Sequence, residues 1–211
     1  DFMLTSAVPD GEDAPSWFLL SMAGIPWDGT AGCELVAEWD GHGMTATQSH
    51  GMRFTDLPGT RFAWQGAPED LLAVIGPFAA SKFSAVIVGI VRSAVGAARE
   101  RLAGRGPDLR PYEQVEWTRA ETDAWLIDQA YEGLLRGVEG GAPPVEAIRA
   151  KQAIAELAES CCLRLCRVLG GGTFSASSPF GWWFEDVRAL GYLRPPWSLA
   201  HDVLLEAQIG G

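Results

Sequence analysis

The sequence predicts an α+β protein that is mainly α: a partial small β-sheet domain at residues 1–64, then a four-helix-bundle type of C-terminal domain at residues 67–211. Two observations predict this class. Short runs of aromatic and branched residues, separated by Gly, Asp and Pro, fill the first part and are typical of strands and turns. Further on, apolar residues recur in steps of three and four, which indicates long amphipathic helices.

Four strands are expected in the first part, and the segments between them are rich in turn-forming residues. The expected strands are Phe2–Ser6, Trp17–Met22, Cys33–Trp39 and Thr45–Phe54. Pro58 and Gly59 then form a turn. A sheet that starts at residue 1 leaves an edge and apolar faces uncovered, so we expect the sequence to lack a preceding part.

Five helices are expected in the second part, each bounded by proline or glycine. They cover about residues 67–102, 111–139, 144–169, 180–190 and 197–207. Acidic residues after Ala67-Pro68 favour the first start, because a helix N-terminus attracts negative charge. An apolar stripe is predicted on the second helix and on the third, and such stripes are typical of the helices in a bundle. Their expected members are Ala120, Ala124, Ile127, Tyr131, Leu134, Val138, Ile148, Ile154, Leu157, Cys161, Leu165 and Val168.

The most apolar helical stretch lies in the first helix. Residues 71–91 are apolar enough to raise the question of a membrane span, but they include Pro77 and Lys82 and continue as an amphipathic helix. Phe83 to Val91 is apolar on all sides, so we expect this segment to lie inside the bundle rather than in a membrane.

Charge and cysteine content exclude some functions. The formal net charge is −11, which argues against a nucleic-acid surface because such surfaces need clustered Lys and Arg. The four cysteines have no partners at metal-ligand spacing, so no metal site is expected. We expect reduced, buried thiols in a cytoplasmic protein.

Four stretches occur in an order that matches a known family. They are Phe2-Met-Leu-Thr-Ser6, then Gly43-Met-Thr-Ala-Thr-Gln-Ser-His50, then Gln114, and finally Leu169-Gly-Gly-Gly172 followed by Asp186-Val-Arg188. In their order and spacing they resemble the acyl-CoA dehydrogenase superfamily over nearly the whole chain. The resemblance lacks the family's N-terminal helical domain and the first part of its middle sheet.

The resemblance implies a flavin bound between the sheet and the bundle: FAD, or FMN in the monooxygenases of this fold. Residues implied in cofactor binding are Thr5, Ser6, Thr47, Ser49, Gln114, Gly170 and Gly171. Thr5 and Ser6 would face the flavin ring, whereas Gln114 and the glycines would contact the dinucleotide of a neighbouring subunit. Each also has a plain structural alternative: a strand threonine, a first-turn glutamine or a helix C-cap. Implied partners are acyl-CoA or another small molecule and further subunits in a homo- or hetero-oligomer, a dimer or tetramer.

The family's catalytic carboxylate is not found at either of its two usual places. These places fall near Ala79 and Ala80 in the first helix and near Arg194-Pro195-Pro196. Three functions therefore remain open. The chain is part of an acyl-CoA dehydrogenase-like oxidoreductase, a flavin-dependent monooxygenase of the same fold, or a non-catalytic subunit that completes an active partner. A monooxygenase needs no carboxylate base, because its reduced flavin reacts with O₂.

Overall fold

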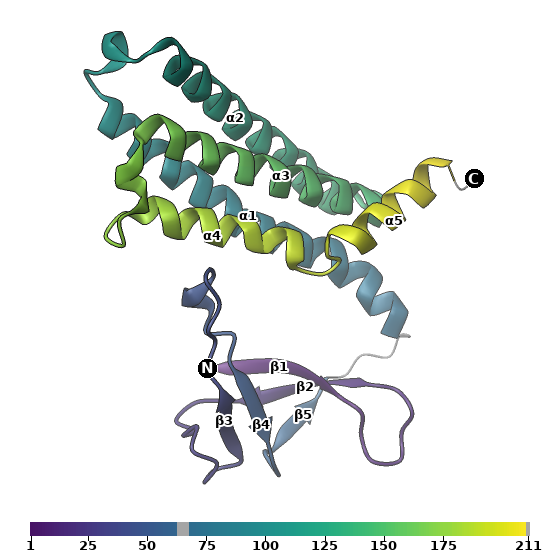
Figure 1. The fold of residues 1–211 in the computed structure, drawn as a ribbon. Coiled ribbons are helices and arrows are strands. Elements are labelled where there is room, and N and C mark those ends of the chain that lie inside the picture. The colour runs from purple at the N-terminus through teal and green to yellow at the C-terminus, as the bar shows by residue number, and fades with distance from the viewer. Residues whose placement is uncertain (63–67, 210–211) are drawn as a thin grey trace. The chain divides into compact units, whose positions relative to one another are not determined.

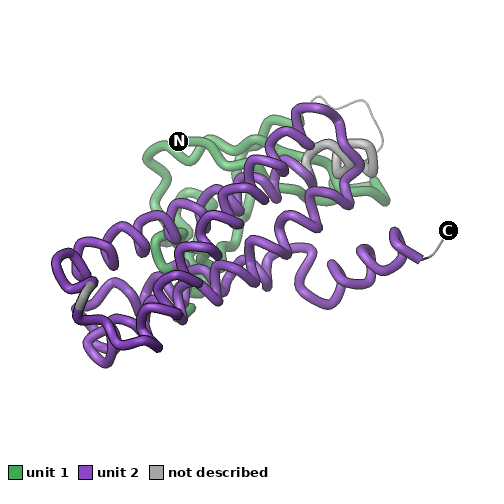
Figure 2. Tube along the Cα trace, turned by 90° about the horizontal axis from the view of Figure 1, so that it is seen from above, with its two compact units in different colours: residues 1–41, 45–74 green, residues 42–44, 75–211 purple. Residues whose placement is uncertain are grey.

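The structure is a computed structural model that describes residues 1–62 and 68–209. The chain divides into two compact units, which Figure 2 colours separately. One unit comprises residues 1–41 and 45–74, and the other comprises residues 42–44 and 75–211. The domain limits expected at residues 64 and 67, and the helix start expected at Ala67, lie outside the described residues.

The first unit contains two small antiparallel sheets. Strands β1 (Phe2–Ala7), β2 (Ser16–Ser21) and β5 (Gly59–Arg61) form one sheet in the order β1-β2-β5. Strands β3 (Cys33–Ala37) and β4 (Gly51–Phe54) form the other. Arg61 binds Glu12 through two hydrogen bonds of 2.6 and 2.7 Å, which ties β5 to the loop between β1 and β2.

Two strand predictions need correction. Thr45 to Phe54 is not one strand, because Thr45–Thr47 forms a short 3-10 helix, η1, and only Gly51–Phe54 pairs as β4. Gln48, with φ of 47°, leaves the extended conformation and interrupts the expected strand. Strand β5 was missed, because three residues after a proline are too few to show an alternating pattern.

The second unit is a helical bundle (Figure 1), as the sequence predicts. Its helices are α1 (Pro68–Leu102) from residue 75 onward, α2 (Pro111–Gly140), α3 (Pro144–Leu169), α4 (Pro179–Tyr192) and α5 (Trp197–Ile209). Two 3-10 turns, η2 (Gly106–Asp108) and η3 (Gly171–Phe174), precede α2 and follow α3. Gly141 ends α2 in the left-handed conformation, with φ of 68°, where a side chain would be strained.

One continuous apolar core joins four helices of the bundle. Fully buried members include Ile87, Val88 and Val91 of α1, Ala120, Ile127 and Leu134 of α2, Ile154, Cys161 and Leu165 of α3, and Phe180, Val187 and Leu190 of α4. Most members of the stripes predicted on α2 and α3 belong to this core. Val168 is buried in a separate small cluster, and Ile148 is partly buried outside the core. Burial of apolar area at roughly 25 cal/mol per Å² is the main source of its stability.

The expectation that residues 83–91 are buried on all sides is wrong. Phe83 and Val86 are 44% and 48% exposed, whereas Ile87, Val88 and Val91 face the core. An apolar run does not reveal how many sides of a helix have neighbours. Residues Gly76–Leu102 are long and apolar enough to cross a membrane by length and composition, and 44% of the most apolar window is buried inside the protein.

Candidate functional site

One end of the bundle forms an open pocket of about 680 Å³. A small apolar cluster of Leu102, Leu109 and Val168, with Trp117 and Leu169 against it, joins the end of α1, the start of α2 and the end of α3. The pocket is lined by Arg99, Leu102, Ala103, Gly104, Gly106, Leu109, Gln114, Trp117 and Thr118. We call this region the cluster end of the bundle.

Gln114 lies at the cluster end with its side-chain amide oriented. Its Nε2 donates a hydrogen bond of 2.7 Å to the carbonyl oxygen of Leu109. In the part of the chain that the structure describes, its Oε1 accepts no hydrogen bond, and the residue is exposed. Gln114 therefore offers a fixed acceptor at the pocket wall.

The glycines that follow α3 lie at the same end, because Leu169 packs against the cluster. Gly170 has φ of 76°, and its carbonyl oxygen accepts hydrogen bonds from the N–H and hydroxyl of Thr173. Gly171 and Gly172 are exposed, and a Cβ on either would meet no atom within 4 Å. Their N–H groups donate to no described residue, so they are open to an acceptor such as a phosphate oxygen.

Cations near this end differ in how freely they can bind an anion. Arg99 pairs with Glu121 at 2.7 Å, and Arg167 pairs with Glu116 at 3.2 Å. Arg105, in the loop before η2, is exposed and forms no ion pair with the residues that the structure describes. Arg105 is therefore an available cation beside the pocket.

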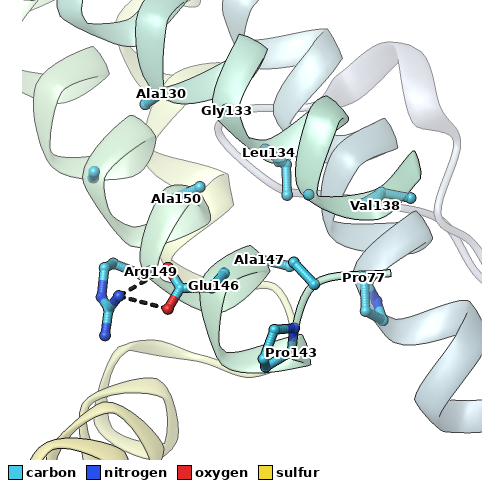
Figure 3. A pocket seen from close by; sticks show the side chains of 13 residues that line it. Pro77, Ala130, Gly133, Leu134, Val138, Pro143, Glu146, Ala147, Arg149 and Ala150 are labelled. Carbon is cyan, nitrogen blue, oxygen red and sulfur yellow. Dashed lines mark hydrogen bonds and ion pairs between the residues drawn. The ribbon is translucent and has the colours of Figure 1, made fainter. Parts of the chain in front are cut away.

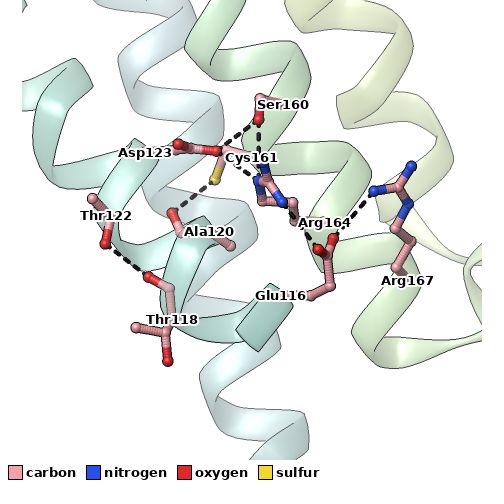
Figure 4. Close-up of polar contacts among 9 residues, drawn as sticks. All are labelled: Glu116, Thr118, Ala120, Thr122, Asp123, Ser160, Cys161, Arg164 and Arg167. Atoms are coloured by element: carbon pink, nitrogen blue, oxygen red, sulfur yellow. Dashed lines mark hydrogen bonds and ion pairs between the residues drawn. The ribbon is translucent and has the colours of Figure 1, made fainter. Parts of the chain in front are cut away.

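A buried ion network links α2 and α3 next to this end (Figure 4). Glu116, only 4% exposed, accepts from Arg164 at 3.0 Å and from Arg167. Arg164 also donates to Asp123 at 3.1 Å, and Ser160 donates to the same carboxylate at 2.8 Å. Sequence reasoning missed this network, although the spacing of seven between Glu116 and Asp123 places both carboxylates on one helix face.

The remaining predicted cofactor residues belong to the first unit. Thr5 is half-buried on β1 opposite Phe18, and Ser6 is exposed on the same strand. Thr47 and Ser49 are exposed, and their hydroxyl oxygens lie 2.8 Å apart. The hydroxyl groups of Thr47 and Ser49 thus form a hydrogen bond with each other by η1. Gln114, Gly170 and Gly171 lie instead at the cluster end of the bundle.

Neither place where a carboxylate base was sought carries one. Ala79 and Ala80 occupy the first place on α1, half-buried and buried. The second place is the corner between α4 and α5, residues 193–196, which has no acidic residue. The nearest acids in sequence on α5, Asp202 and Glu206, are exposed.

A buried lysine holds this α4–α5 corner. Lys151 on α3 is 1% exposed, and its Nζ donates to the carbonyl oxygens of Leu193 at 2.7 Å and Pro195 at 2.8 Å. Burial lowers the pKa of Lys151 to about 8. The corner is closely packed, since a Cβ on Gly191 would collide with the indole ring of Trp197.

Another cavity, of about 320 Å³, lies between the end of α2 and the start of α3 (Figure 3). Its walls carry small and apolar side chains, among them Ala130, Leu134 and Ala147. Its charged residues, Glu146 and Arg149, neutralise each other through hydrogen bonds of 2.7 and 2.8 Å. Among the residues that the structure describes, this cavity offers no free charged group for catalysis.

No group of three or more His, Cys, Asp or Glu suited to a metal ion occurs among residues 1–62 and 68–209. The four thiols are free; burial raises the pKa of Cys161 to about 12 and raises that of Cys162 as well. Such thiols stay protonated and are poor nucleophiles at neutral pH.

The Gly43-Met44 pair of the sequence motif packs on α4. The Met44 N–H donates to Oδ1 of Asp186 at 2.5 Å. A Cβ on Gly43 would lie 2.5 Å from the carbonyl oxygen of Glu185 and 2.6 Å from its carbon. Only glycine fits this approach, because the atoms it meets are backbone of a packed helix.

Gly43→Ala is therefore expected to lower the free energy of unfolding by about 2 kcal/mol, the usual cost of overpacking. Urea denaturation of the two proteins measures the difference. Gly89→Ala is the matched control, because Gly89 is an exposed α1 residue with no atom near its added Cβ and alanine favours the helix. Equal stability of Gly43→Ala and the unchanged protein would contradict the close packing on α4.

Comparison with known proteins identifies the fold. No family model and no curated protein sequence matches this chain. Among solved structures, it is similar to nitrososynthase from Micromonospora carbonacea var. africana, with a TM-score of 0.75 and 22% identity, over 100% of this chain and 56% of that chain. It is also similar to KijD3 in complex with FMN and a dTDP-amino sugar, with a TM-score of 0.80 and 20% identity, over 99% of this chain and 55% of that one.

An acyl-CoA dehydrogenase from Slackia heliotrinireducens matches with a TM-score of 0.73 and 17% identity, over 100% of this chain and 58% of the other. The predicted resemblance is confirmed at the level of fold: the chain has part of the acyl-CoA dehydrogenase fold, as small β-sheets followed by five helices. It spans just over half the length of the structures it matches.

Proposed function

We propose that this chain is part of a flavin-dependent monooxygenase that uses the acyl-CoA dehydrogenase fold. The observation that carries this proposal is the absence of a carboxylate at Ala79-Ala80 and at the α4–α5 corner, within the part of the chain that the structure describes. A dehydrogenase must remove a proton from its substrate, which requires a base within hydrogen-bond reach. When bound, a reduced flavin supplies chemistry with O₂ that needs no such base.

The cluster end of the bundle fits a dinucleotide. The open N–H groups of Gly171 and Gly172, the exposed Arg105 and the oriented amide of Gln114 form a donor and acceptor set suited to phosphate and ribose. We assign this end to the ADP part of FAD, from a neighbouring subunit of a dimer or tetramer. Thr5 and Ser6 on β1, with Thr47 and Ser49 by η1, would hold the flavin ring.

Gly171→Ala is expected to weaken FAD binding about tenfold while leaving FMN binding unchanged. The added Cβ meets no atom of this chain, so the protein keeps its stability, but it blocks approach of the ADP part. Quenching of flavin fluorescence measures both affinities. Gly140→Ala, a similarly open glycine at the far end of α2, is the control. An equal loss of affinity for FAD and FMN, or no loss for either, would contradict the assignment of this end to the ADP part of FAD.

The reaction is tested with the purified protein and chemically reduced flavin. A monooxygenase consumes O₂ and forms an oxygenated product, and its flavin is not bleached by acyl-CoA without oxygen. Anaerobic bleaching by an acyl-CoA would instead establish a dehydrogenase with its base elsewhere. The substrate class in the first case is a small molecule with an oxidisable phenol or amine.

A second candidate function rests on the same observation, that neither position expected to hold the catalytic base carries a carboxylate. A subunit that lacks catalytic groups can still complete the flavin site of a partner, because the cluster end supplies contacts without chemistry. A protein that stays colourless with added flavin, and that co-purifies with a larger homologue, would support this function and exclude the first.

A further inference from the structure

A pocket of about 570 Å³ lies between α3, the loop with η3, and α4, and the function proposed above does not use it. We call it the α4 pocket. Its size is typical of sites for small organic ligands. Apolar side chains form most of its walls, chiefly Leu163, Phe174, Trp182 and Phe184. Phe174 is 93% exposed at its rim, which is a costly place for a phenyl group without a contact.

Ser178 in the α4 pocket has a buried hydroxyl without a partner. The residue is 5% exposed, and its Oγ forms no hydrogen bond to any described residue. Ser178 precedes the first residue of α4, yet its side chain does not cap that helix. A buried hydroxyl without a hydrogen-bond partner is unfavourable, so its retention points to a ligand atom that pairs with it.

The first turn of α4 adds backbone donors at the same wall. Gly181 lines the pocket, and the N–H groups of Phe180 and Gly181 lie in the first turn, where a helix provides no acceptor. No hydrogen bond from these two groups to a described residue occurs outside the helix. These groups and Ser178 Oγ therefore favour a ligand with an oxygen acceptor.

Glu185 and Arg188, the two charged side chains that line the pocket beside His42, pair with each other. Arg188 donates to Glu185 at 2.8 Å, and both side chains line the pocket. An anionic ligand would compete with Glu185 for Arg188, and a cationic ligand would compete with Arg188 for Glu185. Burying a charge without a free partner is unfavourable, so the pocket selects a neutral molecule.

We propose that the α4 pocket binds a neutral aromatic compound that carries a carbonyl or phenolic oxygen. The ring lies against Trp182 and Phe184, and the oxygen pairs with Ser178 and the first-turn N–H groups of α4. This site goes beyond the proposed flavin chemistry and does not depend on it. Its test therefore needs no flavin and no turnover.

The test measures binding of para-fluorobenzamide, para-fluorobenzoate and para-fluorobenzylamine by ligand-observed fluorine NMR. The neutral amide is expected to bind at least tenfold more tightly than either charged analogue. Ser178→Ala should weaken amide binding about tenfold, and Trp182→Ala should abolish it. Ser177→Ala, whose hydroxyl is exposed and pairs with Ser175, is the control and should bind as the unchanged protein does.

Urea denaturation of Ser178→Ala gives an independent readout. Removal of an unpaired buried hydroxyl should leave the midpoint unchanged or raise it, while ligand binding falls. A lower midpoint would show that the hydroxyl caps α4, and would overturn its assignment to a ligand. Equal amide affinity in Ser178→Ala, tighter binding of a charged analogue, or displacement of the amide by FMN would each overturn the proposed site.

Discussion

Glu116→Gln is expected to lower the free energy of unfolding by about 3 kcal/mol, because it removes the buried carboxylate that Arg164 and Arg167 share. Glu116 is 4% exposed and accepts from Arg164 and Arg167. Glutamine keeps the shape and one oxygen acceptor, so the loss reports the charge rather than a cavity. Urea denaturation at neutral pH, with the slope compared between proteins, measures it.

The same change at an exposed pair gives the matched control. Asp128, on the same helix, binds Arg92 at 2.9 Å, but the two side chains are 37% and 64% exposed. Exposed pairs contribute about 0–1 kcal/mol, so Asp128→Asn should have little effect. Equal losses at Glu116 and Asp128 would contradict a special role for burial. The ion pair between Arg164 and Asp123 remains in both variants, so Glu116→Gln does not remove the whole network.

The bundle could be predicted because its signals are local. Pro111, Pro144 and Pro179 each stand at the first residue of a helix, and glycines follow α2 and α3. Burial of a helix face depends instead on which elements pack against it, and the sequence of one helix does not show this. Phe83 and Val86 are therefore exposed, although the apolar run predicts that they are buried. The strand β5 and the turn at Thr45–Thr47 depend on pairing and on φ angles that no periodicity encodes.

The sequence predicted individual residues of the candidate site but not their arrangement in space. Gln114 and Gly170 were expected from the family resemblance, and the cluster of Leu102, Leu109 and Val168 explains how they come to one end of the bundle. Lys151 was missed, because a single lysine within a helical pattern usually faces solvent. Its two acceptors lie 42 and 44 residues away, so only the folded chain reveals them.

Lys151 should make stability depend on pH in a way that can be measured by substitution. Its pKa is about 8 in the folded protein and 10.5 as the ordinary value, so the unfolded chain binds more protons between these limits. Stability contributed by this group therefore rises as pH increases from 8 to 10.5, by about 3 kcal/mol in total. Below pH 8 both states are protonated and the whole burial penalty remains.

The buried cysteines act in the opposite direction. Burial raises the pKa of Cys161 from 9.0 to about 12, and the pKa of Cys162 is raised too. Their unfolded forms lose protons first, so their contribution to stability is complete below pH 9 and falls above it. The unchanged protein should thus gain stability just above pH 8 and lose it again at higher pH.

Lys151→Met separates the two effects. The difference in unfolding free energy between the unchanged protein and this variant cancels the cysteines, and should rise by about 1.4 kcal/mol per pH unit above pH 8. The two carbonyl groups that lose their donor, on Leu193 and Pro195, add an offset that does not vary with pH. Lys82→Met, which removes the other lysine of the sequence, is the reference for loss of one lysine.

A flat difference curve would mean that the ammonium group of Lys151 is solvated, and that the α4–α5 corner is held by packing alone. A rising curve would establish a buried amine beneath the corner where a carboxylate base was sought. That outcome bears on function, because the protonated amine has no lone pair with which to accept a substrate proton, and Lys151, only 1% exposed, lies out of reach of a substrate. The α4–α5 corner would then act as a fixed wall without a proton acceptor, in agreement with the proposed flavin chemistry that needs no carboxylate base.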